Sequence, residues 1–272
     1  MEQVNAGIIP ITDFQLGLSV ILVIITGVIT AVLQLGLLKS LFWGTVRTFV
    51  QLTLIGYVLN FIFNFNNLAL IILILIIMCG VASKTAVNRT LLVGQYPLVL
   101  GFISLLASTF LVGTIVVALI IAPEPWYTAR IVIPIFGMIL GNSMNGISLA
   151  LDRLVSEVRA RVYEVESLLC FGATPWEAVR DCVKVALRAG MTPTINSLMV
   201  VGLVSLPGMM TGQILGGADP QQAVRYQIVV MLMITAAVAI GCLSLVMMYY
   251  KKLFTFDDAV ATSLFDTTGS KK

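Results

Sequence analysis

The chain has 272 residues, of which 59% are hydrophobic and only 11% are charged, and its mean hydropathy is +1.03. Soluble domains carry about 25% charged residues, so this composition excludes an ordinary soluble domain and predicts an integral membrane protein in a lipid bilayer. The net charge of +3 gives no indication of a nucleic-acid partner, and none is expected.

Seven apolar segments follow one another along the chain, and most of them reach the roughly 20 residues that a membrane-spanning helix needs. We therefore expect an all-α polytopic membrane protein with seven transmembrane helices. One membrane domain is expected over residues 1–252, followed by a flexible cytoplasmic tail over residues 253–272. The expected spans are Leu16 to Leu38, Phe42 to Phe63, Leu68 to Ser83, Leu98 to Ile121, Ile131 to Leu151, Thr194 to Leu215 and Ala223 to Tyr249.

The basic residues predict how these spans are oriented. If the N-terminus is outside, fourteen of the sixteen lysines and arginines fall on the inner side, and only Arg130 and Arg225 fall outside. Cytoplasmic loops are enriched in Lys and Arg, so this split predicts an outside N-terminus and a cytoplasmic C-terminus. The long polar interruption at residues 152–193 then lies in the cytoplasm.

Residues 152–193 are predicted to form a helical hairpin that projects from the fifth span. Apolar residues recur at helical spacing from Leu151 to Leu169, which predicts one continuous rod about 30 Å long. Gly172 stands where a helix stop is expected. A second helix is expected to end at Gly190, and Thr192-Pro193 to begin another.

The turn of this hairpin carries helix-capping residues and two aromatic side chains. Thr174, Pro175 and Glu177 form a capping box with proline at the first helical position. Phe171 and Trp176 beside them offer aromatic anchors to a soluble partner. The alternative is that both arms pack only on each other and on the membrane surface.

Several polar residues lie within the expected spans. Arg47 lies inside the second span with Gln51 one turn further along. Arg47 either snorkels to the inner headgroups or serves as a gate or a contact for an anionic substrate. Amides in hydrocarbon need partners or a wet cavity, and Pro207 should bend or break the sixth span. Packing alone is the alternative explanation of the neighbouring glycines and methionines. The candidate translocation pathway comprises Arg47, Gln51, Asn142, Asn145, Pro207, Met209, Met210, Thr211 and Gln213.

Some chemistries are excluded by what the sequence lacks. Without histidine there is no imidazole metal site and no Ser-His-Asp triad, and without a G-x-x-x-x-G-K-[ST] loop the chain cannot hydrolyse ATP by that mechanism. No expected span holds a central Asp or Glu that would support ion-coupled transport. A projecting hairpin without coupling chemistry of its own indicates an external motor. We therefore expect no catalytic residue and no bound cofactor in this chain.

Two stretches resemble a known family of membrane proteins. Val165–Ala178, which reads VESLLCFGATPWEA, resembles the E-A-A…G cytoplasmic loop of bacterial ABC-transporter permeases, although Ser167 and Leu168 replace the alanines. The region from Gly137 to Gly217 is similar to a small permease family of bacterial iron exporters and plant aluminium-tolerance proteins.

This resemblance implies a permease that works as a pair of membrane subunits, expected to be a homodimer, in the inner membrane of a bacterium. Two separate ATP-binding subunits would bind ATP and Mg and supply the energy. The residues expected to dock on them are Glu166, Phe171, Gly172, Thr174, Pro175, Trp176 and Glu177.

The resemblance also implies that the substrate is iron or another metal and that it is exported. The spans lack the carboxylate and imidazole ligands that iron favours, so no metal ligand is assigned. A polar organic solute such as a nucleotide sugar would fit the amides and hydroxyls of the candidate pathway equally well. A seven-helix receptor with a long loop between its fifth and sixth spans is the alternative from another class.

Overall fold

The computed structural model describes residues 11–65, 67–88, 95–255 and 259–261. Every regular secondary-structure element assigned in these residues is a helix, so the predicted all-α class is confirmed. The elements are α1 (Asp13–Leu18), α2 (Val20–Val32), α3 (Leu38–Phe65), α4 (Leu68–Asn88), α5 (Gln95–Ile115), the π-helix η1 (Val116–Ile121), α6 (Ala129–Ala160), α7 (Val162–Cys170), α8 (Pro175–Val200), α9 (Gly208–Leu215), α10 (Pro220–Tyr249) and the 3-10 helix η2 (Tyr250–Leu253).

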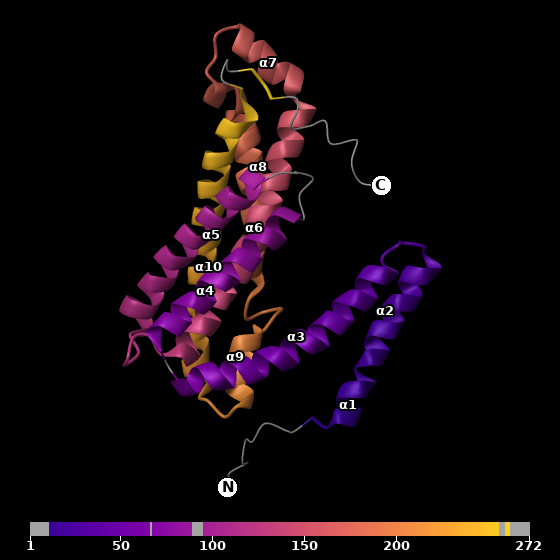
Figure 1. Ribbon diagram of the computed structural model, residues 1–272, viewed down its shortest axis with the longest axis vertical. Helices are drawn as coiled ribbons and strands as arrows, with labels where there is room; N and C mark the ends of the chain where they lie inside the picture. The colour runs from indigo at the N-terminus through magenta and orange to yellow at the C-terminus, as the bar shows by residue number, and fades with distance from the viewer. Residues whose placement is uncertain (1–10, 66, 89–94, 256–258, 262–272) are drawn as a thin grey trace.

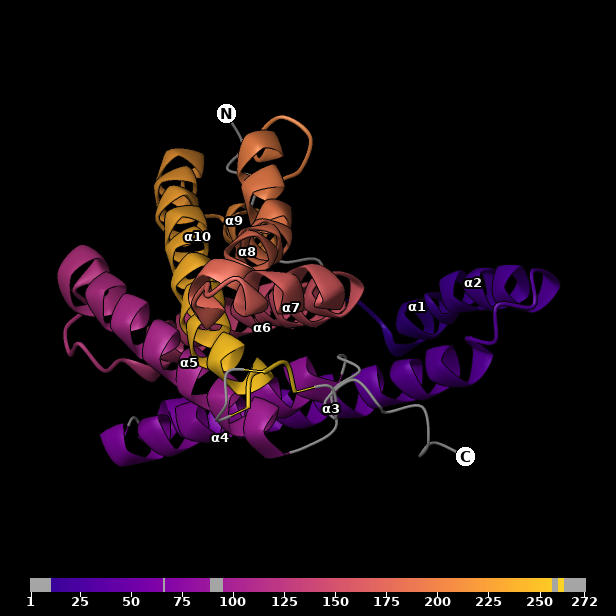
Figure 2. The ribbon, with the colours of Figure 1, turned by 90° about the horizontal axis from the view of Figure 1, so that it is seen from above.

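Helices α4, α5, α6, α8 and α10 pack together as one bundle (Figures 1 and 2). Helix α6 lies at its centre because its apolar residues recur every three or four positions and face four neighbouring helices. Ile139, Ile147 and Leu154 on this face are fully buried, as are Ala237 and Leu245 on the facing helix α10.

Two glycines allow α6 and α8 to cross closely. A Cβ atom added to Gly190 would lie 2.7 Å from the carbonyl oxygen of Gly146 and 2.8 Å from Cβ of Ala150. By contrast, a Cβ atom added to Gly141, Gly208 or Gly212 would meet nothing within 4 Å. The close helix contact within this chain therefore depends on Gly146 and Gly190, and not on Gly141, Gly208 or Gly212.

The N-terminal helices α1, α2 and α3 form an arm that stands away from the bundle (Figure 1). Helix α2 packs on α3, and only the end of α3, around the buried Ile62, reaches the bundle. Most apolar side chains of the arm are exposed, among them Leu22, Phe42 and Leu52. Such a surface suits a lipid environment, where apolar side chains need no protein cover.

Six helical segments among the described residues are long and apolar enough to cross a membrane. The predicted span from Thr194 to Leu215 is not one of them, because helix α8 ends at Val200 and α9 starts at Gly208. Pro207 lies at this interruption, as predicted, and occupies the N-cap position of α9. The break is longer than one proline requires, since residues 201–207 are all non-helical.

Two further predictions about the hairpin are wrong. The first arm is not a continuous rod, because the helix breaks at Arg161 (φ −112°, ψ 23°) and α7 lies across the end of the bundle (Figures 1 and 2). The second arm does not end at Gly190. Helix α8 instead runs through both Gly190 and Pro193 as one element.

The two ends of the bundle differ in what they carry (Figure 1). Helix α7 and the C-terminal end of α10 lie at one end, and α9 lies at the other together with the end of α5 and the start of α6. Residues just after α10 are packed, with Leu253 and Val260 buried and Phe254 paired with Val260 in an isolated antiparallel bridge. Residues 256–258 and 262–272 of the predicted tail lie outside the described residues.

Candidate functional site

A cavity of about 310 Å³ lies where α8 breaks, between α6, α8 and α10. It brings together three residues predicted for a pathway, Asn142, Asn145 and Pro207. It also contains hydroxyl side chains that the sequence analysis missed. The polar residues of its lining are Asn142, Asn145, Thr194, Ser197 and Ser205, and we call this cavity the polar pocket.

The polar pocket is rich in oxygen acceptors. The amide nitrogen of Asn142 donates to the carbonyl oxygen of Met138 at 2.8 Å, which leaves the amide oxygen of Asn142 as an acceptor. The hydroxyl of Ser197 donates to the carbonyl of Pro193 at 3.0 Å and keeps its lone pairs. No charged side chain is part of this lining.

A second cavity of about 300 Å³ lies on the other side of the break and is mostly apolar. Met210 and Gln227 contribute to it, and Gln227 is only 5% exposed, with no hydrogen-bond partner for its side-chain oxygen among the described residues. Val201, Pro207 and Met231 line both cavities. The non-helical segment 201–207 therefore forms part of the wall between a polar and an apolar space.

The remaining predicted pathway residues are not brought together with the polar pocket. Arg47 and Gln51 are exposed on α3, in the N-terminal arm. In α9, Met209 packs partly on the core, and the hydroxyl of Thr211 donates to the carbonyl of Pro207 at 3.1 Å. The side-chain oxygen of Gln213 is buried without a hydrogen-bond partner among the described residues.

The turn between α7 and α8 is held by local hydrogen bonds, as the sequence predicts. After α7 ends, Gly172 adopts φ +89° and its N–H donates to the carbonyl of Leu169 at 2.9 Å, while Ala173 donates to Leu168 at 3.0 Å. This is a Schellman motif, and the left-handed backbone at Gly172 favours glycine. The turn therefore presents a fixed surface at the end of the molecule.

The capping box at the start of α8 is confirmed, with Pro175 at the first helical position. The backbone N–H of Thr174 donates to the carboxylate of Glu177 at 2.8 Å, and the N–H of Glu177 donates to the hydroxyl of Thr174 at 3.3 Å. Reciprocal bonds of this kind satisfy backbone donors that a helix start otherwise leaves without partners.

The aromatic side chains near this turn have different surroundings. Phe171 is 90% exposed and Tyr163 on α7, which the sequence analysis missed, is 83% exposed. Trp176 instead packs against Tyr250, with ring centroids 5.4 Å apart. Glu166 on α7 is half-buried. The surface available to a partner at this end therefore contains Phe171 and Tyr163, whereas Trp176 helps to hold the hairpin on the bundle.

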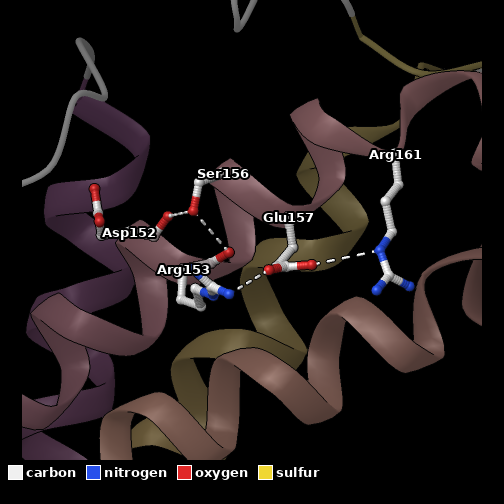
Figure 3. A network of polar contacts seen from close by, with 5 residues as sticks. All are labelled: Asp152, Arg153, Ser156, Glu157 and Arg161. Atoms are coloured by element: carbon white, nitrogen blue, oxygen red, sulfur yellow. Dashed lines mark hydrogen bonds and ion pairs between the residues drawn. The ribbon is translucent and has the colours of Figure 1, made fainter.

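Glu157 links the last turns of α6 to Arg161, the residue at which the helix breaks (Figure 3). Its carboxylate lies 2.7 Å from a guanidinium nitrogen of Arg153 and 3.4 Å from Nε of Arg161, and its side chain is only 14% exposed. In the sequence these residues alternate in charge at a spacing typical of one helix face. That spacing does not reveal that the helix bends at Arg161. Glu157 therefore helps to fix the direction of α7.

Replacing Glu157 with Gln should loosen this junction. The change removes two ion pairs, and pairs at partly exposed positions each contribute about 0.2–1 kcal/mol. We expect hydrogen exchange of the amides at residues 158–165 to accelerate about two- to fivefold, as measured by mass spectrometry on the purified protein. Lys184→Gln is the control, because it breaks an exposed ion pair with Asp181 within α8. Equal exchange in Glu157→Gln and wild type would contradict this role.

The capping box makes the stability of the hairpin depend on pH. Hydrogen bonds from the backbone and the hydroxyl of Thr174 lower the pKa of Glu177 below its ordinary value of 4.5. Because the folded pKa is lowered, the stabilisation is complete above the ordinary pKa and is lost as the pH falls through the lower, folded value. We expect the wild-type protein to melt at a higher temperature than Glu177→Ala at neutral pH, and this gap to shrink in acid. A gap that widens in acid would contradict the capping role.

The helices and their apolar surfaces define an all-helical integral membrane protein that crosses the bilayer several times. The chain belongs to the UPF0014 family, which is described as an uncharacterised protein family and whose model matches residues 13–254.

Three relatives show the range of this family. The chain is 39% identical to the UPF0014 membrane protein YjkA of Bacillus subtilis, over 89% of this chain and 95% of the relative. It is 35% identical to the protein Aluminum Sensitive 3 of Arabidopsis thaliana, over 92% and 90%. It is 33% identical to the "Probable iron export permease protein FetB" of Escherichia coli, over 90% and 93%. These matches confirm the resemblance found in the sequence. No solved structure matches the chain.

Proposed function

We propose that this protein is the membrane-spanning permease subunit of an ABC transporter that exports iron or another metal with energy from a separate ATP-binding subunit. The observation that carries the proposal is the continuity of α8. One helix of 26 residues, about 39 Å long, runs from the exposed turn at Pro175 to its end at Val200, and Ser197 in its last turn lines the polar pocket. A movement imposed at the turn is therefore transmitted to the pocket.

The exposed end of the hairpin is the proposed docking surface for the ATP-binding subunit. Phe171 offers an aromatic anchor there on a backbone fixed by the Schellman motif, and Tyr163 offers a second one at the start of α7. Closure of the partner on ATP would displace α7 and α8 as a lever. At the other end of this lever, segment 201–207 would change its position between the two cavities. ATP and Mg belong to the partner, as does the chemistry on the phosphates.

We infer that the membrane topology is the one predicted from the basic residues. Counted as one discontinuous span, the end of α8 and α9 bring the six long helices to seven. Broken spans are tolerated in a membrane where their backbone is buried in protein or lines a cavity, and Val201 and Pro207 line two of them. The hairpin would then face the cytoplasm together with the C-terminus.

A second copy of the chain is the proposed partner within the membrane. Gly141, Asn142 and Asn145 are exposed on α6, although this helix is apolar enough to span a membrane. Amides facing lipid are costly, so a second subunit or a water-filled pathway between two subunits should cover them. A homodimer in which the two polar pockets face a shared water-filled pathway would cover these amides.

The choice of a metal rests on the name of the Escherichia coli relative and is consistent with the chemistry of the pocket. A nucleotide sugar carries phosphate charges, and the lining of the polar pocket contains no Lys or Arg to neutralise them. Oxygen acceptors without positive charge favour a cation instead. The absence of positive charge therefore favours a metal over a nucleotide sugar.

The proposal is tested by expressing the chain together with an ATP-binding subunit of the ABC class from the same genome. We expect the two to co-purify, and the ATPase rate of the complex in lipid nanodiscs to rise on addition of Fe²⁺. A nanodisc that contains the ATP-binding subunit alone is the control. A chain that never associates with any such subunit, or a complex whose ATPase rate ignores every metal and solute, would contradict the proposal.

A further inference from the structure

We propose, building on the export function above, that the polar pocket recognises its metal as a hydrated cation, with water molecules between the metal and the protein. The substrate class would thus be a di- or trivalent cation that keeps its inner coordination shell. This deepens the proposed function, which does not itself say how the ion is held.

The ligand set of the pocket leads to this inference. Its polar side chains are two amides and three hydroxyls, and its one sulfur belongs to Met231. The described residues of the chain contain no group of three or more Asp, Glu, Cys or His able to hold a metal ion. Hard cations give up water reluctantly, and protein sites that strip it away use several carboxylates or imidazoles. Neutral oxygens are better suited to bind the water shell.

The size of the pocket is consistent with such a complex. The volume of about 310 Å³ is far larger than a single ion needs. A cation with six waters needs roughly 200 Å³ and fits, whereas a bare ion would leave most of the space for unbound solvent. The pocket is therefore suited to an ion with its hydration shell.

The polarity of the pocket matches the water shell as well. Waters bound to a cation donate hydrogen bonds outwards, and the amide oxygen of Asn142 and the hydroxyl of Ser197, both in the lining, are acceptors. The pocket also lies at the C-terminal end of α8, where the helix dipole is negative. Outer-shell contacts of this kind bind weakly enough for the ion to leave again, as transport requires.

The test uses an ion that cannot exchange its ligands. Hexaamminecobalt(III) has a size close to that of a hexahydrated cation and presents N–H donors. We expect it to compete with Fe²⁺ for stimulation of the ATPase in the reconstituted complex. We also expect the half-maximal concentrations of Mn²⁺, Fe²⁺ and Co²⁺ to agree within about threefold, because direct ligation would instead follow the Irving–Williams order.

A pair of variants ties the result to this pocket. Asn142→Asp supplies a carboxylate to the lining and should make the half-maximal concentrations follow the Irving–Williams order. Asn196→Asp is the matched control, since Asn196 is exposed on α8 and does not line the pocket. Stimulation by Fe²⁺ that hexaamminecobalt(III) leaves unchanged, with the Irving–Williams order in the wild type, would overturn the hydrated-ion inference and leave the export function standing. A complex that no metal stimulates would overturn both.

Discussion

Replacing Tyr163 and Phe171 together with Asp is expected to abolish binding of the ATP-binding subunit. Both side chains are almost fully exposed at the end of the bundle, so the substitutions leave the fold intact. Central aromatic anchors contribute about 2 kcal/mol or more each, which predicts an affinity at least 100-fold weaker for the double variant. The measurement is the amount of ATP-binding subunit that co-purifies with the permease, followed by titration in nanodiscs.

Two further variants separate docking from stability. Trp126→Asp places the same charge at an exposed aromatic residue between α5 and α6, away from the hairpin, and should bind the subunit normally. Trp176→Asp removes the packing on Tyr250 and should lower the melting temperature of the permease itself. Wild-type binding by the Tyr163 and Phe171 double variant would refute the proposed docking surface.

Gly190→Ala is expected to destabilise the protein by about 1–3 kcal/mol, although alanine is the better helix former. The new methyl group would lie 2.7 Å from the carbonyl oxygen of Gly146 and 2.9 Å from the sulfur of Cys242, so α6 and α8 have to separate. Since both glycines line the polar pocket, this separation should also reduce transport. The measurements are the thermal unfolding midpoint in detergent and metal-stimulated ATPase activity.

The matched control is Gly80→Ala in the middle of α4. A Cβ atom there meets nothing within 4 Å, so the substitution should be neutral or stabilise the protein by up to about 1 kcal/mol. Opposite signs at the two positions would show that the helix crossing depends on the missing side chain at Gly190. If both alanine variants unfold at the same temperature as wild type, the proposed close contact does not limit stability.

The parts of the hairpin that depend on local chemistry could be predicted from the sequence. Gly172 ends one helix, and Thr174 with Glu177 begins the next, because these bonds join residues only a few positions apart. The bend at Arg161 was not predictable in this way. Apolar spacing continues across it, since Val165 on α7 is still buried, and periodicity does not record the direction of a helix.

The continuity of α8 was also not predicted. Here the sequence does carry local signals for a helix end, but the helix continues through them. Gly190 and Pro193 are signals for a helix end, but Gly190 is required by the close contact with Gly146, and Pro193 is accommodated within the helix. Tertiary packing therefore overrides the local preference. This difference matters for function, because an interrupted helix would not connect the exposed turn to the polar pocket.

The lining of the polar pocket could be predicted in part. Asn142 and Asn145 stand out in the sequence because amides are costly in hydrocarbon, and the polar pocket contains both. The hydroxyls of Thr194, Ser197 and Ser205 carry no such signal, since a Ser or Thr in a membrane helix can bond the carbonyl four residues earlier, as Ser197 does. No sequence pattern reveals which polar residues of different helices share a cavity.

The central claim is that this chain is a metal pathway that does no work itself and is driven through its hairpin. It is tested most directly in proteoliposomes in which the hairpin side faces outwards, with iron outside and the interior initially free of iron. With the ATP-binding subunit present, we predict iron accumulation inside that requires ATP and is lost in the Tyr163 and Phe171 double variant. Concentrative uptake by vesicles that contain this chain alone, without any nucleotide, would contradict the account.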